Sequence, residues 1–401
     1  MNREDFPILN NVVYLDNGAT TLKPKCVIDA MNDYYLLHTS NIHRGDYDAA
    51  IKTNELYDNV RKVVADFINC DDNTVIYTSG ATMSINMVVF GFMKNYLKEG
   101  DEVLLNKAEH ASNILPWIKL SEEIGIVIKY IPLNEDYSLT LDNIKKCITS
   151  KTKVISLAHV SNVIGDVRDI KEITKFAHEN NILVNVDGAQ SIPHMKIDFK
   201  DLDIDFLSFS GHKMCGPTGV GILVGKYELL EKMDPLMYGG GMNSSFEEDN
   251  SYELKTIPTR FEAGTPPIAE VIGLGEAIKY LESIGMDNIH NHEIELKKYF
   301  LDKVKDINNI IIYNRSTDSG IIAFNVDKVF AQDTSMYLNH YKIAVRAGNH
   351  CTKLLKDEMN IRNTVRVSLY FYNNYEDIDK LIEAQDVLIA QASPSNLISL
   401  I

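Results

Sequence analysis

The sequence lacks paired cysteines, and no stretch near its start reads as a signal peptide. The five cysteines, at positions 26, 70, 147, 215 and 351, form no CxxC pair. An odd, scattered set in a chain of 401 residues argues against a disulfide framework and favours a reducing compartment. Because the N-terminal stretch MNREDFPILNN has no apolar core, we expect a cytoplasmic protein.

The sequence also lacks long apolar runs and an excess of positive charge. Its longest apolar stretch, near Met87–Met93, is far shorter than the roughly 20 residues of a membrane-spanning helix. Lys and Arg number 40 against 56 Asp and Glu, a formal net charge of −16. Such a chain repels phosphate backbones and anionic lipid heads. We therefore expect neither nucleic acid nor membrane as a partner, and an anionic ligand needs a local cluster of donors.

The pattern of apolar runs predicts two units of structure. In the first two-thirds, short strand-like runs alternate with helical periods, which is typical of a mostly parallel sheet in an α/β fold. The predicted strands are Val75–Thr78, Val103–Leu105, Val154–Ala158, Ile182–Val186 and Phe206–Phe209. After a Gly/Pro-rich stretch over 238–267 come helices near 268–284 and 288–306, strands near 320–326, 343–346 and 364–369, and a last helix near 375–391. We expect a large domain over 17–270 and a smaller α+β domain over 271–401 that includes segment 1–16.

Chemically useful side chains follow four of these strands. They are Asp187 after 182–186, Lys213 in Ser-Gly-His-Lys after 206–209, Ser79–Thr82 at a helix start, and His110 after 103–105. Ligands of open α/β sheets bind at the carboxyl ends of strands. A lysine, an acid, a helix N-terminus and a histidine are what pyridoxal phosphate (PLP) needs for attachment, ring protonation, phosphate binding and stacking.

Each of these elements has a plainer explanation when it is taken alone. Asp187 could cap the turn that follows it, and Ser79–Thr82 could be an ordinary helix cap. A lone lysine usually lies on the surface, and His110 alone would more often be a core or surface histidine. A functional role for Lys213 is favoured because an apolar strand precedes it and the Gly/Pro loop GPTGVG follows it.

Taken together, ten strings identify a family resemblance. YLDNGATTLKP, NIHRG, SGATMSIN, EHASNILPW, HVSNVIG, VDGAQS, SFSGHKMCGPTGVGIL, RFEAGTPP, IAVRAGNHC and VRVSLYFYN occur in that order. They resemble the SufS-type (group II) cysteine desulfurases, PLP enzymes of fold type I within the class V aminotransferase superfamily. The resemblance, over about 13–375, implies a seven-stranded mostly parallel sheet, a homodimer, and conversion of L-cysteine to L-alanine with sulfur supplied for iron–sulfur cluster assembly.

The resemblance also implies roles at individual positions. Lys213 would hold PLP covalently and move protons, His110 would stack on the ring, and Cys351 would be the nucleophile. The other implied cofactor contacts are Asp187, Gln190, Ala81, Thr82, Ser210, His212 and, from the neighbouring subunit, Thr265. The implied substrate contacts are Asn162, Arg346, Arg366, His43 and Ala19. No metal ligand is implied.

Cys351 decides between a desulfurase and a simpler PLP enzyme. A free cysteine is most often a small buried hydrophobe. Cys351, however, lies in the polar segment Arg346–Cys351, whose cationic residues favour the reactive thiolate. Cys215, two residues after Lys213, we interpret as packing. Gln332 stands where relatives served by a zinc-binding acceptor tend to have histidine, so the acceptor, SufU-like or SufE-like, stays open.

Other functions fit the sequence less well. Within the superfamily, selenocysteine lyase, kynureninase and aminotransferases are the nearest alternatives, and an aminotransferase would have no use for Cys351. A nucleotide-binding P-loop nearly appears around Gly225-Lys226 but fails at Val220 and Tyr227. A metal or sulfur carrier could use His290 and His292, yet residues two apart on a helix face different directions.

Overall fold

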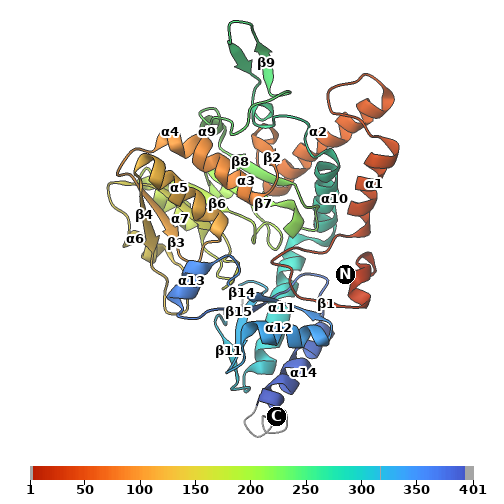
Figure 1. Cartoon of the computed structure of the whole chain (residues 1–401), viewed down its shortest axis with the longest axis vertical. Helices are drawn as coiled ribbons and strands as arrows, with labels where there is room; N and C mark the ends of the chain where they lie inside the picture. The colour runs from red at the N-terminus through yellow and green to blue at the C-terminus, as the bar shows by residue number, and fades with distance from the viewer. Residues whose placement is uncertain (1–2, 317, 393–401) are drawn as a thin grey trace.

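The centre of the molecule is a seven-stranded sheet with strand order β2-β8-β7-β6-β5-β3-β4. The computed structural model describes residues 3–316 and 318–392 (Figure 1). The strands are β2 (Val75–Thr78), β3 (Glu102–Asn106), β4 (Val127–Ile131), β5 (Thr152–Ala158), β6 (Leu183–Asp187), β7 (Phe206–Ser210) and β8 (Gly221–Gly225). All pairs are parallel except those of β8, which runs antiparallel to β2 and β7. The predicted mostly parallel sheet is confirmed.

Helices cover both faces of this sheet because its side chains alternate between two apolar cores. In β3, Leu104 joins one core, whereas Val103 and Leu105 join the other. The first core contains residues of α2 (Asp48–Ile68), α7 (Ile170–Glu179) and α10 (Ile268–Ile284). The second contains residues of α3 (Ala81–Asn86), the π-helix Met87–Met93 that continues it, and α5 (Leu115–Ile124). The apolar run around Met87 is therefore a buried helix.

A second, antiparallel sheet has the order β11-β12-β15-β14. Its strands are β11 (Ile310–Ile312), β12 (Ile321–Val326), β14 (Arg346–Gly348) and β15 (Thr364–Ser368). Helices α11 (Met286–Val304), α12 (Ala331–His340) and α14 (Tyr375–Ala392) lie around it, in blue and cyan in Figure 1. Near the start of the chain, β1 (Val13–Tyr14) pairs in parallel with β13 (Ile343–Ala344), so the N-terminal segment joins the C-terminal elements.

Several elements were missing from the sequence interpretation, among them β4, β8 and a hairpin. β4 is an edge strand with only one fully buried residue, so it carries little alternation. β8 follows a Gly/Pro-rich loop and itself contains two glycines. A hairpin of β9 (Asn243–Phe246) and β10 (Tyr252–Leu254) projects from the body (Figure 1). Among the described residues, no helix is both long enough and apolar enough to span a bilayer.

Candidate active site

A cavity of about 210 Å³ opens where the carboxyl ends of the parallel strands meet the second sheet. Twelve predicted site residues line it: Ala19, Ala81, Thr82, His110, Asn162, Asp187, Gln190, Ser210, His212, Lys213, Arg346 and Arg366. They come from distant parts of the chain and converge because parallel strands present their ends at one edge. Gly18, Ser112 and His350 also line the cavity, and the sequence interpretation did not assign them.

Asp187 and Lys213 form the polar centre of this cavity. Asp187 ends β6, is buried, and accepts a 3.0 Å hydrogen bond from the backbone N–H of Ala189 through Oδ1. Burial raises the pKa of Asp187, whereas the cation of Lys213 opposes that rise. Burial also lowers the pKa of Lys213 to about 8, opposed by Asp187 and assisted by Arg366. The lysine amine is therefore poised near neutral pH to act as a nucleophile or base.

The turn that carries Lys213 is held by an N-terminal segment. The carbonyl oxygen of His212 accepts hydrogen bonds from Thr21 N at 3.0 Å, Thr20 Oγ1 at 2.9 Å and Lys23 Nζ at 2.9 Å. Sequence reasoning missed these contacts, although the residues stand in the quoted string YLDNGATTLKP. Cys215 N donates to Thr21 Oγ1 at 2.8 Å, and Cys215 is fully buried, as its interpretation as packing requires.

His110 follows β3 and faces the cavity as a neutral ring. Its Nδ1 accepts the backbone N–H of Ser112 at 3.1 Å, which leaves the ring proton on Nε2. Burial, together with the cations of Lys213 and Arg346, lowers the pKa of His110 to about 4. A neutral ring can lie against an electron-poor heterocycle without adding a charge to the site.

Hydroxyl and amide groups line another part of the cavity wall. Ala81 N donates to Ser210 Oγ at 2.8 Å, and Thr82 Oγ1 lies 2.7 Å from Ser112 Oγ. Residue 81 begins a helical segment that continues to residue 96, so its first N–H groups face this part of the wall. Gly80 has a φ of +148°, and the lack of a side chain on Gly221 lets β8 approach it closely, since a Cβ on Gly221 would lie 2.4 Å from the Gly80 Cα. This cradle suits a phosphate.

Two arginines form a cationic wall on the side of the second sheet. The Arg366 guanidinium is buried and donates through Nη1 to Asn162 O at 2.9 Å and through Nη2 to Asp16 Oδ1 at 3.0 Å. Its Nε has no hydrogen-bond partner among the described residues. Arg346 lines the same cavity. Such a wall is built to receive a carboxylate.

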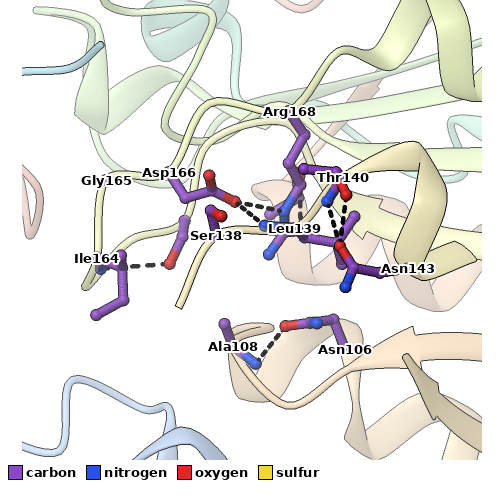
Figure 2. Close-up of polar contacts among 12 residues, drawn as sticks. Asn106, Ala108, Ser138, Leu139, Thr140, Asn143, Ile164, Gly165, Asp166 and Arg168 are labelled. Carbon is purple, nitrogen blue, oxygen red and sulfur yellow. Dashed lines mark hydrogen bonds and ion pairs between the residues drawn. The ribbon is translucent and has the colours of Figure 1, made fainter. Parts of the chain in front are cut away.

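Hydrogen bonds and an ion pair hold the loop that carries Asn162 in place. Figure 2 shows Asp166 contacting both Leu139 and Arg168. Within the loop, Ser161 Oγ accepts a hydrogen bond from the Ile164 N–H at 3.3 Å. The Asp166 carboxylate accepts Leu139 N at 3.1 Å. These contacts fix a tight loop between residues 159 and 168, so that Asn162 Nδ2 reaches the carbonyl oxygen of His350 at 2.9 Å.

Cys351 lies on an exposed loop beside the cavity. Its backbone φ is +59° and that of His350 is +53°, two consecutive left-handed residues that are rare outside glycine. Cys351 N donates to Asn349 Oδ1 at 3.0 Å, and the Cys351 carbonyl accepts Ala111 N at 2.9 Å. The cysteine does not line the cavity, but the preceding His350 does, so the thiol lies at its rim.

Two predicted site residues lie elsewhere in this single chain. His43 and Thr265 line a separate cavity of about 690 Å³. Asn41 Nδ2 donates to Thr265 Oγ1 there at 3.3 Å, and Arg61 pairs with Glu262 at 2.9 Å. Thr265 was expected to bind the cofactor of a neighbouring subunit, and it lines this second cavity rather than the cavity that holds Lys213.

The residues present fit PLP. Gln190 is buried, its Nε2 donates to Gly18 O at 2.8 Å, and its Oε1 has no partner among the described residues, as an acceptor for a ring hydroxyl requires. The amine of Lys213, the buried acid Asp187 and the phosphate cradle supply the remaining contacts. The described residues contain no cluster of ligands for a metal ion, and His292 Nε2 instead contacts Asn373 O at 2.8 Å.

Comparison with known proteins agrees with this fold and site. The family model described as aminotransferase class V matches residues 13–381, and the chain belongs to that family. Within it, a probable cysteine desulfurase of Staphylococcus aureus is 43% identical over 390 residues, 95% of this chain and 94% of the relative. Another, from Halalkalibacterium halodurans, is 42% identical over 383 residues, 94% of each chain. The solved structure of a cysteine desulfurase from Thermococcus onnurineus is 34% identical, with a TM-score of 0.92 and 97% coverage of both chains. A cysteine desulfurase from Escherichia coli is 36% identical, with a TM-score of 0.91 and the same coverage.

Proposed function

We propose that this chain is a PLP-dependent cysteine desulfurase. The observation that carries the proposal is the convergence of Lys213, Asp187 and the paired arginines on one cavity, with Cys351 at its rim. Relatives that align over nearly the whole chain are named probable cysteine desulfurases. An aminotransferase site would need the lysine, the acid and the arginines, but it would have no task for an exposed cysteine held in a left-handed backbone.

Bound PLP would supply an aldehyde for covalent attachment and a ring that accepts electrons. Lys213 would hold it, and Asp187 would pair with its ring nitrogen. Gln190 would bind the ring hydroxyl, and Ser210 and Thr82, with the N–H of Ala81, would bind the phosphate. His212, whose pKa burial lowers to about 4, would join them as a neutral donor.

Different residues of this chain would bind the substrate and transfer its proton. Arg366 and Asn162 bind the substrate carboxylate, which orients the Cα–H bond toward the Lys213 amine. That amine, with a pKa lowered to about 8, accepts the Cα proton and later returns a proton to the product.

The sulfur transfer itself belongs to Cys351. Its thiolate attacks the substrate sulfur, so one S–S bond forms as the substrate's C–S bond breaks, and the electron pair of that bond stays with the substrate carbon. The net change is L-cysteine plus enzyme thiol to L-alanine plus enzyme persulfide, and no external oxidant is needed. A reductant or an acceptor thiol then releases the sulfur.

Two measurements on the purified protein test the proposal. Borohydride reduction followed by peptide mapping should place PLP on Lys213, and L-cysteine with a reductant should give equal amounts of alanine and sulfide. A wild-type protein that carries PLP on Lys213 but forms no alanine from cysteine contradicts the desulfurase assignment. Alanine formed only from selenocysteine would show the chain to be a selenocysteine lyase instead.

We further propose a homodimer. Support comes from exposed apolar side chains on α1 (Lys25–Leu37), where Tyr35, Leu36 and Leu37 are each more than half exposed. The placement of His43 and Thr265 in a second cavity also supports it, because a partner subunit could receive them. Mixing Lys213→Ala and Thr265→Val chains should restore activity in mixed dimers, since one of the two sites would then be intact. Light scattering that gives a monomer mass for the active protein contradicts the dimer.

The remaining expectations belong to the same proposal. We propose a cytoplasmic enzyme that passes its sulfur to a SufU-like or SufE-like acceptor for iron–sulfur cluster assembly. We also propose a large unit over 17–270 and a small one over 271–401 with segment 1–16, supported by the pairing of β1 with β13. Since α10 packs on α1 and α2, the packing favours moving the division toward Gly285, between α10 and α11.

A further inference from the structure

A buried ion pair lies beneath the cavity and takes no part in the chemistry described above. The side chains of Glu109 and Arg168 are both 0% exposed, and Arg168 Nη1 donates to Glu109 Oε1. Arg168 also lies 3.5 Å from the Asp166 carboxylate, a contact drawn in Figure 2. Taking two charges out of water costs several kcal/mol per ion, so hydrophobic residues of equal volume would often serve stability as well. The pair therefore needs another explanation.

The ion pair hydrogen-bonds to both backbone polar groups of one residue, Ala158, at the end of a strand. Glu109 Oε2 accepts the Ala158 N–H at 2.7 Å, and Arg168 Nη1 donates to the Ala158 carbonyl at 2.8 Å. Ala158 is the last residue of β5, lines the cavity, and lies opposite Asp187 in the parallel pairing of β5 with β6. The residue that the ion pair holds thus lies beside the acid proposed to contact the cofactor ring.

The pair also holds the His110 loop. Glu109 directly precedes His110, and its Oε2 accepts Asn113 Nδ2 at 2.8 Å in the turn that follows. From Asn113 a chain of buried polar groups returns to β6. Ser156 Oγ donates to Asn113 Oδ1 at 2.6 Å, and Asn185 Nδ2 donates to Ser156 Oγ at 2.8 Å. One carboxylate therefore links the loop that carries His110 to the strand end beside Asp187.

We propose that Glu109 and Arg168 are positioning residues that set the distance between His110 and Asp187. The inference rests on the proposed function. Both side chains hydrogen-bond to Ala158 at the end of β5, and Glu109 is also the residue before His110 in the chain. The pair therefore fixes the position of the His110 loop relative to that strand end. Arg168 adds a positive field that helps to keep Asp187 ionised beside the ring nitrogen. A fixed pair of charges does this better than apolar side chains, because its hydrogen bonds have direction.

The test separates position from stability by removing the charges one at a time and together. Glu109→Gln and Arg168→Met should each lower the melting temperature, since the first leaves Arg168 with Asp166 alone and the second leaves both carboxylates without their cation. The double variant, which keeps only the Asp166 carboxylate of this cluster, should regain part of the melting temperature. It should still bind PLP about tenfold more weakly, and the bound cofactor should show a smaller circular dichroism. The reason is that His110 and Asp187 are no longer held at a fixed distance from each other.

The control is Glu102→Gln at the first residue of β3, the strand that ends three residues before Glu109. Glu102 is 7% exposed, lies 2.7 Å from Lys129 Nζ and accepts Thr149 Oγ1 at 2.6 Å, so it is also a buried carboxylate with a cationic partner, although Lys129 is more exposed than Arg168. It should lower the melting temperature and leave PLP affinity and circular dichroism unchanged. A double variant with wild-type affinity and dichroism would show that the pair is structural only and would overturn the inference.

Failure of the proposed function is recognised separately. If wild-type protein forms no borohydride-reducible adduct on Lys213, the cofactor assignment is wrong. The positioning role is then still tested in the cofactor-free protein by nitrogen NMR of the His110 ring. The double variant should lose the signature of the Nδ1 bond to Ser112, and the Glu102→Gln protein should keep it. An unchanged ring signal in the double variant again contradicts the inference.

Discussion

Arg346 and Arg366 stand directly opposite each other on the antiparallel strands β14 and β15. Like charges at such positions repel, and within residues 3–316 and 318–392 only Arg366 of the two has a carboxylate partner, Asp16 at 3.0 Å. Burial lowers the pKa of Arg366, opposed by Asp16, so holding both cations there costs free energy. An anion entering between them would relieve that repulsion, which supports the proposal that the substrate carboxylate binds there.

Arg366→Lys should therefore weaken substrate binding more than it slows turnover. The ammonium cannot keep the bonds to Asn162 and Asp16 and also meet a carboxylate in a forked geometry. Losing charge-assisted hydrogen bonds worth about 1.5–3 kcal/mol should raise KM for cysteine by roughly tenfold to 100-fold. Steady-state kinetics checks this, with the exposed Arg362→Lys as control, and an unchanged KM for Arg366→Lys would remove Arg366 from the carboxylate site.

Gly18→Ala should disturb the same site by steric contact. A Cβ at residue 18 would lie 3.0 Å from the Arg366 Cζ, and that guanidinium is held by two other bonds and cannot easily move. We expect a several-fold rise in KM with little change in melting temperature. Gly239→Ala is the control, because its added Cβ would meet its nearest neighbour at 3.6 Å. Equal kinetics for the two variants would contradict the contact.

The attachment of PLP to the apoprotein should depend on pH through Lys213. Its pKa is lowered from 10.5 to about 8, and only the neutral amine attacks an aldehyde. The rate of attachment should rise with pH and level off above about 8. Asp187→Asn should move the midpoint to lower pH, because the carboxylate raises the lysine pKa. Stopped-flow absorbance measures both, and a midpoint near 10.5 in the wild-type protein would be the contrary result.

Cys351→Ser should separate cofactor binding from sulfur transfer. The serine keeps the loop contacts of the backbone and leaves the cavity lining intact, so PLP content and its absorption should be unchanged. Alanine and sulfide release from cysteine should fall to background, because a hydroxyl is a poor nucleophile toward sulfur. Cys26→Ser, at another exposed cysteine, is the control and should keep full activity. Cysteine desulfuration retained by Cys351→Ser would take Cys351 out of the mechanism.

The local patterns were sufficient for much of the fold. The predicted strand Val75–Thr78 and the predicted helix 268–284 coincide with β2 and α10. Both elements are strongly apolar and are bounded by glycine or proline, so short-range preferences and burial agree there. β4 and the hairpin β9–β10 were not predicted, because a half-exposed edge strand and a projecting hairpin carry no clear apolar period.

The sequence by itself determined the chemical parts: a lysine, an acid, a histidine and a hydroxyl-rich helix start, each after a strand, and a cysteine in a polar loop. Strand ends can be read from apolar runs, because burial selects side chains over a few neighbouring residues. Only the tertiary structure decided that Thr20, Thr21 and Lys23 clamp the turn before Lys213 and that Glu109 meets Arg168. Those contacts join residues 59 or more positions apart, and their partners are chosen by the packing of whole elements.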